Sequence, residues 1–284
     1  MVDCSIRLFH QKDDSPCDGL LLLHGLTGSP YEFKRVAQCA YERGITVYAP
    51  VLPGHCDNRS SLATSTWRDW TKGVKEAFDL LQQDCRYVYV GGLCLGALLA
   101  LEFGIRYPDL PKGLILYSTP LILDGWQMPA ISRLNFLLPF VARLPLVKKC
   151  NIQGSPVHSL KDERLRSIVH RATRNGRKFR GGFSFTPVPS MGQFISLKQY
   201  VKRNLDRITA PTFALHSRED DVCSLKNIDL LSRELRNCST KILNDCYHII
   251  TLDKESKTVC DSTVAFIKNQ NASNFQQDFV AAMP

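Results

Sequence analysis

The chain has 284 residues, 44% of them hydrophobic, so it is long enough to bury the core of one large α/β domain or of two small ones. Its formal net charge of +9 would suit nucleic acid, an anionic membrane or an acidic partner. No RNP, zinc-finger or P-loop pattern is present, which argues against nucleic-acid binding. No stretch approaches the roughly 20 apolar residues of a membrane helix, so we expect no integral membrane segment.

The cysteines are eleven in number and scattered, without a C-x-x-C pair. That distribution is typical neither of a disulfide scaffold nor of a zinc site. It predicts a reducing compartment in which most cysteines are small buried residues. The first residues, "MVDCSIRLFHQKDD", lack the apolar core of a signal peptide. We therefore expect a soluble cytoplasmic protein, with no metal centre and no bound cofactor.

Short apolar runs and longer amphipathic segments alternate along the chain. Six runs predict strands, at 19–23, 45–49, 86–90, 113–117, 212–216 and 240–244. Five segments predict helices, at 31–43, 66–83, 95–107, 225–236 and 254–269. Several strands are apolar without alternation, as in a parallel sheet covered on both faces. The repetition predicts a doubly wound, mostly parallel α/β sheet.

Residues 121–192 interrupt this rhythm, because they contain no convincing strand. Their first part, "GWQMPAISRLNFLLPFVARLPLV", is apolar with several prolines, and their second part, "HRATRNGRKFRGG", is strongly basic. We interpret the segment as a cap inserted over one end of the sheet, between core segments 1–120 and 193–270. The last residues, 271–284, are polar, and we expect them to form a loosely held tail.

The stretch "VYVGGLCLGALLALEFG" carries the first candidate for chemistry. Cys94 follows a predicted strand and opens the next helix, in the pattern G-x-C-x-G. Backbones crowd at such a strained turn, and Gly92 and Gly96 supply the small flanking residues that it requires. The N-terminus of the helix favours the thiolate form of a cysteine. The alternative is a buried structural cysteine beside a glycine-rich turn.

A glycine-bearing loop follows the first predicted strand, in "LLLLHGLTGSP" (20–30). In this architecture the backbone N–H groups of such a loop point at a developing oxyanion. The two donors would be the amides of Leu26 and of Leu95, the residue after Cys94. An ordinary turn is the alternative, and we expect His24 to support the loop rather than to catalyse.

Two later loops supply an acid and a base. In "LHSREDDV" (215–222), Asp220 falls at the expected place after a late strand, with Glu219 and Asp221 as neighbouring alternatives. In "DCYHIITLDKE" (245–255), His248 lies between the last predicted strand and the last predicted helix. The chain order Cys94, Asp220, His248 is that of nucleophile, acid and base.

With these motifs the chain resembles the α/β-hydrolases, and more narrowly the small capped carboxylesterases and monoacylglycerol lipases of bacteria. The resemblance rests on "LLLHGLTGSPYEF", "YAPVLPGHC", "GGLCLGALLAL", "YPDLPKGLILYSTP", "DRITAPTFALHSREDDV" and "CYHIITLDKE". It implies an α/β-hydrolase fold of about eight strands with a helical cap. It also implies a triad at Cys94, Asp220 and His248 and an oxyanion hole at Leu26 and Leu95. The cysteine is the departure, and it resembles the nucleophile of dienelactone hydrolases, polyhydroxyalkanoate synthases and certain carrier-protein acyl shuttles.

A cysteine nucleophile changes the expected substrate. A thiolate attacks a carbonyl well, but it also leaves a tetrahedral intermediate more easily than an alkoxide does. Thioesters and activated esters therefore suit it better than alkyl esters. We expect a Cys94 acyl thioester and hydrolysis of a carboxylic ester or thioester. The alternatives are transfer to a non-water acceptor, a catalytically idle hydrolase-fold binding protein, and an engineered Ser-to-Cys change.

The cap offers candidate contacts to substrate. Trp126 and Phe136, in its apolar part, are candidates for lining an acyl pocket, and plain packing of cap helices is the alternative. Arg174, Arg177 and Lys178 belong to the basic run. That run is either a solvated face or a landing site for a phosphopantetheine thioester, on coenzyme A or on an acidic acyl carrier protein.

Overall fold

The computed structural model describes residues 4–10, 17–128, 130–145, 147–153, 159–174 and 185–281. In these ranges seven strands form one sheet, in the order β1-β3-β2-β4-β5-β8-β9. They are β1 (Ile6–Leu8), β2 (Cys17–Leu23), β3 (Ile45–Ala49), β4 (Cys85–Leu93), β5 (Gly113–Tyr117), β8 (Thr212–Ser217) and β9 (Cys238–Leu243). Only β1 runs antiparallel to its neighbour. The predicted doubly wound, mostly parallel sheet is confirmed, with seven strands instead of about eight.

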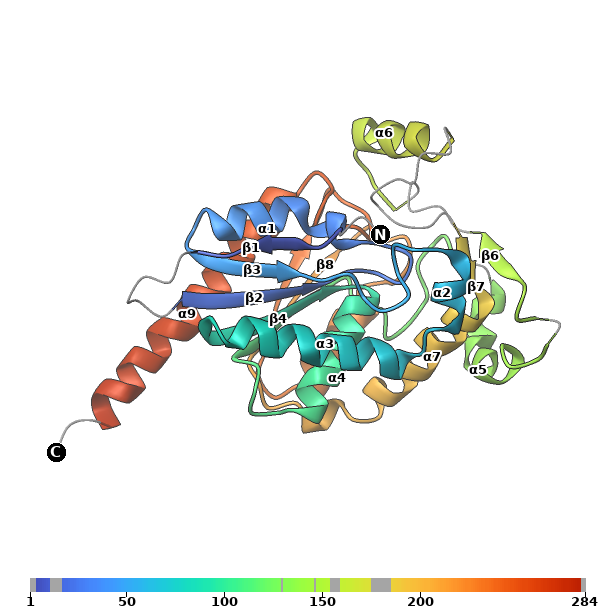
Figure 1. Cartoon of the computed structure of the whole chain (residues 1–284). Helices are drawn as coiled ribbons and strands as arrows, with labels where there is room; N and C mark the ends of the chain where they lie inside the picture. Colours follow the sequence, from blue (N-terminus) through green and yellow to red (C-terminus); the bar gives the residue numbers. More distant parts are fainter. Residues whose placement is uncertain are drawn as a thin grey trace.

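Helices cover both faces of this sheet (Figure 1). Around the sheet the chain forms η1 (Pro30–Phe33), α1 (Lys34–Tyr41), α2 (Arg59–Thr64), α3 (Trp67–Gln82), α4 (Leu95–Arg106), η3 (Leu205–Arg207), α8 (Lys226–Glu234) and α9 (Ser256–Ala281). Each of the five predicted helices is present. The unpredicted α2 has six residues, too few to show an amphipathic period. The C-terminal helix α9 continues past residue 270, where a loose tail was expected.

The sheet separates two hydrophobic clusters. Leu21 and Leu23 of β2 point to one side, where they pack with residues of α3 and α4. Leu20 and Leu22 point to the other side, where they pack with residues of α1 and α9. Successive side chains of a strand alternate between faces, so a strand buried on both faces is apolar at every position. This is why a central strand such as β5 appears in the sequence as an unbroken apolar run, whereas the edge strand β9 does not.

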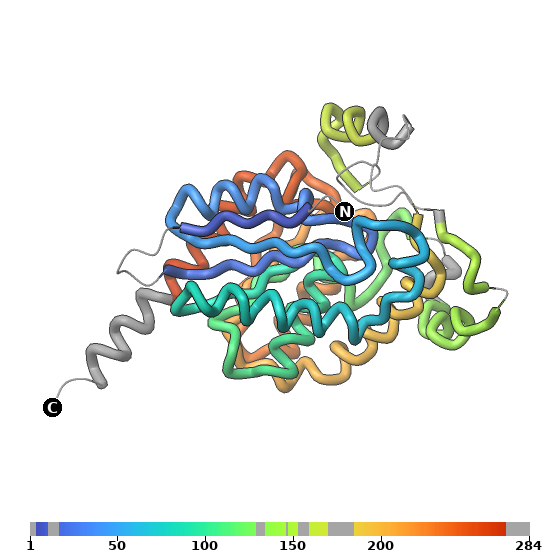
Figure 2. The backbone as a smooth tube through the Cα atoms, in the orientation of Figure 1, coloured from blue at the N-terminus to red at the C-terminus, as the bar shows by residue number. Residues whose placement is uncertain are grey.

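The interval expected to form the cap holds η2 (Ala130–Leu137), α5 (Leu138–Val141), β6 (Asn151–Gln153), α6 (Glu163–Arg174), β7 (Phe185–Pro187) and α7 (Val188–Lys202). The strand arrows in Figure 1 point toward these segments, and Figure 2 shows the same segments at that end of the sheet. β6 and β7 pair as a small antiparallel sheet, where no strand was predicted. Helix α7 continues through residue 193, where the core was expected to resume. It contacts both α5 and the core helix α4.

A disulfide joins Cys39 of α1 to Cys260 of α9, with their Cα atoms 6.4 Å apart. It was not predicted, because the two residues are 221 positions apart and meet only when the two helices pack. Cys17 and Cys85 are also partners in the register of β2 and β4, with their sulfurs 3.2 Å apart. The cysteines are therefore less scattered in space than in sequence, and a reducing location stays a prediction.

Within the described ranges, no helix has the length and apolar character needed to cross a bilayer.

Candidate active site

The candidate site lies where the direction of the sheet reverses. From β2 the chain continues outward to β3 on one side, and from β4 it continues to β5 on the other side. The carboxyl ends of strands at such a reversal leave a crevice in which ligands bind. Gly25 and Leu26 follow β2 at this point, and Cys94 follows β4. The topology thus brings two distant sequence motifs together.

Cys94 occupies a strained turn between β4 and α4. Its φ of 55° and ψ of −111° lie where a residue with a side chain is rarely found. A Cβ on Gly96 would stand 1.8 Å from the carbonyl oxygen of Leu23, and a Cβ on Gly92 would stand 2.1 Å from the carbonyl group of Gly96. Close backbone approach therefore requires both glycines, as the G-x-C-x-G pattern predicts.

The two amides predicted to bind an oxyanion lie beside this turn. Leu95 is the first residue of α4, so its N–H has no acceptor within the helix. Leu26 lies in the loop after β2, and it lines the same cavity as Cys94. In the described part of the chain, neither amide has a hydrogen-bond partner. Both N–H groups are therefore available to an incoming oxygen.

Two histidines support the loop after β2. His24 Nδ1–H donates to the carbonyl of Gly25 at 2.9 Å, and its Nε2 accepts the Leu52 N–H at 3.1 Å. His55 Nε2–H donates to the carbonyl of Leu26 at 2.8 Å. Burial lowers the pKa of His24 to about 3 and that of His55 to about 4. Both rings are neutral hydrogen-bonding groups, in agreement with the supporting role expected of His24.

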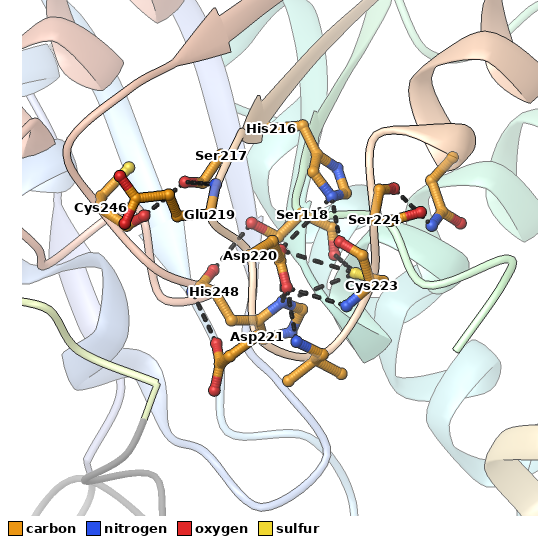
Figure 3. A network of polar contacts seen from close by, with 12 residues as sticks. Ser118, His216, Ser217, Glu219, Asp220, Asp221, Cys223, Ser224, Cys246 and His248 are labelled. Atoms are coloured by element: carbon orange, nitrogen blue, oxygen red, sulfur yellow. Dashed lines mark hydrogen bonds and ion pairs between the residues drawn. The ribbon is translucent and has the colours of Figure 1, made fainter. Parts of the chain in front are cut away.

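Asp220 holds the ring of His248 (Figure 3). Nδ1 lies 2.8 Å and 3.0 Å from the two carboxylate oxygens, so Nδ1–H donates to the carboxylate and Nε2 is left to face the cavity side of the ring. Nε2 is buried, and among the described residues it has no hydrogen-bond partner. His248 lines the cavity together with Cys94. The arrangement suits a general base that serves a nucleophile in this cavity.

The charges of Asp220 and His248 shift each other's pKa in opposite directions. Burial alone would raise the pKa of Asp220, but the charge and hydrogen bond of His248 outweigh burial and lower it to about 2. Burial alone would lower the pKa of His248, but the charges of Asp220, Cys223 and Cys94, together with the hydrogen bond to Asp220, raise it well above its ordinary value. The pair therefore stabilises the imidazolium that forms when His248 accepts a proton.

The neighbouring acids of this loop have different partners. Asp221 accepts the backbone N–H of His248 at 3.2 Å and the hydroxyl of Ser159 at 2.9 Å. Glu219 forms an ion pair with a lysine that precedes α6, at 2.8 Å. The geometry thus supports Asp220 as the acid on the ring. The other two acids connect the loop after β8 to the insertion, and Asp221 also binds the backbone of His248.

Two buried residues around Asp220 were not predicted from the sequence. His216 Nε2–H donates to the carbonyl of Cys223 at 2.8 Å and lies 3.4 Å from Asp220 Oδ2 (Figure 3). The backbone N–H of Cys223 donates to Asp220 Oδ1 at 2.9 Å. Burial raises the pKa of the Cys223 thiol well above its ordinary value, so this thiol does not compete as a nucleophile. No periodicity marks His216, because it is one of several buried residues of β8.

The cavity beside Cys94 has a volume of about 220 Å³. Besides Leu26 and Leu93, which flank the reacting turn, its apolar lining comes from loops and from α7: Leu123, Met128, Met191, Phe194, Val222 and Ile249. These residues were not predicted, because an apolar side chain that lines a cavity looks in sequence like one that fills a core.

The structure does not bring the two predicted apolar cap contacts to this cavity. Trp126 is 64% exposed and Phe136 is 51% exposed, and neither lines it. Trp126 is turned away because its Nε1–H donates to the carbonyl of Glu219. Arg174 is the last residue of α6, and its side chain lies outside the described residues. Arg177 and Lys178 also lie outside them.

Two clusters in the described ranges bring three metal-binding side chains together. In one, the carboxylate of Asp220 and the ring of His216 are already engaged in the hydrogen bonds given above. In the other, Cys39 and Cys260 lie beside Asp261, but their sulfurs are bonded to each other. Neither cluster presents three uncommitted ligand atoms.

The sequence of this chain is similar to those of known hydrolases. The family model described as serine aminopeptidase, S33, matches residues 14–255. A thermostable monoacylglycerol lipase of Bacillus sp. (strain H-257) is 26% identical over 250 residues, covering 87% of this chain and 89% of that protein. A carboxylesterase of Bacillus subtilis (strain 168) is 24% identical over 252 residues, covering 88% of this chain and 92% of that protein.

Solved structures share the fold. A structure from work on LipS and LipT, two metagenome-derived lipolytic enzymes, superimposes with a TM-score of 0.76 at 24% identity, covering 93% of this chain and 97% of that chain. The monoacylglycerol lipase of Paleococcus ferrophilus also has a TM-score of 0.76, at 15% identity, covering 95% of this chain and 100% of that chain. These likenesses confirm the predicted α/β-hydrolase fold.

Proposed function

This chain belongs to the serine aminopeptidase S33 family of hydrolases, and from that premise we propose that it cleaves a carboxylic ester or thioester through an acyl thioester on Cys94. One observation carries the proposal. Cys94, on its strained turn, and His248, held by Asp220, line one cavity together with Leu26. The lipase and esterase names of the relatives support small-molecule esters as the substrate class.

In the proposed reaction, His248 Nε2 takes the thiol proton while the Cys94 sulfur bonds to the carbonyl carbon. The amides of Leu26 and Leu95 bind the oxyanion that forms. When the intermediate collapses, His248 returns the proton to the departing alkoxide or thiolate, and the acyl group stays on Cys94. A water that loses its proton to His248 then attacks the thioester, which releases the acid and restores the thiol.

The sulfur of Cys94 favours thioesters over alkyl esters. In the tetrahedral intermediate of a thioester, two thiolates of similar leaving ability compete, so a substantial share of intermediates goes forward. In that of an alkyl ester, the Cys94 thiolate leaves more readily than the alkoxide unless His248 protonates the alkoxide first. We therefore propose a thioester or an activated ester as the preferred substrate.

The test compares a thioester with an alkyl ester of the same acyl chain, for the wild type and for Cys94→Ser. The quantity compared is the kcat/KM for the thioester divided by the kcat/KM for the ester. We expect this ratio to be at least about tenfold higher in the wild type than in Cys94→Ser, which corresponds to roughly 1.4 kcal/mol of transition-state stabilisation. Cys94→Ala is the control, and its intact mass should show no acyl adduct. A ratio that Cys94→Ser leaves unchanged would mean that the sulfur does not determine the substrate class.

A second candidate function is transfer of the acyl group to a thiol of coenzyme A or of an acyl carrier protein. The basic run 170–180 favours it, because an anionic thiol carrier would be attracted to that charge. Mass spectrometry after incubation of the acyl-enzyme with coenzyme A separates the two functions. Formation of acyl-coenzyme A faster than free acid would support transfer, and free acid alone would support hydrolysis.

A further inference from the structure

Glu32 is a buried carboxyl group inside the loop that carries Leu26. It lies on η1, and only 7% of it is exposed. Its Oε2 accepts the Gly25 N–H at 2.8 Å, and a Cβ on Gly28 would stand 2.0 Å from its Oε1. The carboxyl group therefore fills the inside of the turn from Gly25 to Gly28. It holds in place the segment that presents the Leu26 amide.

The same carboxyl group lies close to the reacting groups. A Cβ on Gly25 would stand 3.4 Å from Glu32 Oε2 and 3.8 Å from the Cβ of Cys94. Glu32 also lines the cavity that Cys94 and His248 share. Buried carboxylates are rare unless a cation pairs with them. Among the described residues, no lysine or arginine acts on this one, and His248 is the cation that does.

Glu32 changes charge near neutral pH. Burial raises the pKa of its carboxyl group to about 7, against the smaller opposite effects of the Gly25 hydrogen bond and the His248 charge. The titratable groups that face it are Cys94 and His248 in the cavity and Cys56 in the loop after β3. Burial chiefly raises the pKa of Cys56 to about 12, with contributions from Cys4 and from the Glu32 charge.

We propose that Glu32 is a positioning residue of the oxyanion loop and that the site is competent for acyl transfer while Glu32 is neutral. This inference rests on the proposed function. A neutral carboxyl group still accepts the Gly25 N–H through its carbonyl oxygen, and it adds no charge. An ionised one places a negative charge beside the Cys94 thiolate and the oxyanion. Asp220 already supplies the anion that the imidazolium needs, so a second anion chiefly opposes the reaction.

The first test is the pH profile of kcat/KM for a neutral ester. Glu32→Gln keeps an oxygen acceptor for Gly25 but cannot ionise. We expect its kcat/KM to match the wild type below about pH 6 and to exceed it about tenfold above about pH 8, where the wild type carries the extra anion. Profiles of the same shape would overturn the proposal.

The control is Glu102→Gln, which also removes a buried carboxyl group whose pKa is raised by burial. Glu102 lies on α4 and forms an ion pair with Arg106 at 2.8 Å, and it does not line the cavity. Its loss should leave the shape of the pH profile unchanged. If Glu102→Gln altered the profile in the way that Glu32→Gln does, the effect would come from lost stability, and the proposal would fail.

A second test needs no turnover. Below about pH 6, iodoacetamide should alkylate Cys94 at the same rate in the wild type and in Glu32→Gln. Above about pH 8 the rate should be higher in Glu32→Gln, since ionised Glu32 in the wild type disfavours the thiolate. If no ester or thioester is cleaved, the proposed function fails, and this measurement still decides the role of Glu32.

If Glu32→Gln does not fold, an NMR titration of labelled glutamates in the wild type and in Glu102→Gln takes the place of the alkylation measurement. A carboxyl group that titrates with a midpoint near pH 7 in both the wild type and Glu102→Gln supports the proposal. The absence of such a midpoint overturns the proposal.

Discussion

Cys94 differs from the other cysteines in its surroundings rather than in its type. Burial raises the pKa of Cys238 to about 11, and it is the main cause that raises that of Cys56 to about 12. Such thiols react slowly with alkylating agents at neutral pH. Cys94 instead stands at the N-terminus of α4 and lines the cavity of His248.

We therefore predict that one equivalent of iodoacetamide labels Cys94 first and abolishes activity. Peptide mass spectrometry identifies the labelled residue. Cys150 is exposed and serves as an internal control, because its labelling rate is that of an accessible thiol outside the cavity. A label spread evenly over several cysteines, with activity retained, would refute the assignment of Cys94.

Replacement of Asp220 and replacement of Asp221 should lower kcat by different amounts. Asp220→Asn removes the charge that stabilises the imidazolium, and kcat should fall by about 10²- to 10⁴-fold. His248→Ala should cost more, because this residue carries out each proton transfer. Asp221→Asn keeps an acceptor for the His248 N–H, so it should cost less. Circular dichroism checks the fold of each variant, and a harmful Asp221→Asn with a harmless Asp220→Asn would place the acid one residue later.

Residues of the site could be predicted when their position in the chain order carries information. Cys94, Asp220 and His248 each follow a predicted strand at the same edge of a parallel sheet, so their meeting follows from topology. Glu32 and His216 could not be found in this way, because their importance lies in burial and contacts that no spacing in the sequence shows. Trp126 and Phe136 were misplaced because an apolar residue in the insertion has no sequence mark that separates a cavity wall from an exposed face.

At the scale of secondary structure, the turn between β4 and α4 depends on the approach of β2. Gly96→Ala would place a methyl group 1.8 Å from a backbone oxygen of β2, which cannot move without disturbing the sheet. We expect a loss of several kcal/mol in the free energy of unfolding, or no soluble protein. Gly44→Ala is the control. Nothing lies within 4 Å of that Cβ, and its φ of 85° alone should cost about 1 kcal/mol. Equal losses in urea unfolding would contradict this account of the turn.

The disulfide between α1 and α9 should stabilise the fold by restricting the unfolded chain. For residues 221 positions apart, the loop-closure model gives at most roughly 5 kcal/mol. We expect a reducing agent to lower the Tm of the wild type and to leave that of Cys39→Ser unchanged. Thiol titration of the denatured protein should detect two more thiols after reduction. The same Tm and the same thiol count with and without reducing agent would show that the bond does not form.

The elements that could be predicted were those long enough to show a period. Buried strands such as β3 and β5 are unbroken apolar runs bounded by turns, and α3 has a clear amphipathic repeat. β1, β6 and β7 have three residues each, too few for any pattern. The predicted start of the core at residue 193 falls inside α7, which packs on both parts. Sequence shows that a helix is apolar, but not which neighbours bury it.

At the scale of the whole molecule, the net charge lies in the insertion. Residues 121–192 contain 12 lysines and arginines and 3 acidic residues, and the rest of the chain contains 24 of each kind. The rest of the chain is therefore neutral, and the charge of +9 belongs to the insertion. A concentration of cations in one segment attracts anionic ligands and raises their association rate.

Neutralising Arg174, Arg177 and Lys178 together should therefore weaken the use of an acyl-coenzyme A substrate and spare a small neutral ester. Exposed charges act mainly on the association rate, and salt screens them over about 8 Å at physiological ionic strength. We expect kcat/KM for the anionic substrate to fall roughly three- to tenfold at low salt, and the difference to vanish at about 1 M salt. A matched control removes three exposed cations of the core, Arg233, Arg236 and Lys241. An equal effect of the two triple variants would mean that only total charge matters. An effect on both substrates, or on neither, would leave the basic run as a solvated face and favour hydrolysis of a neutral ester.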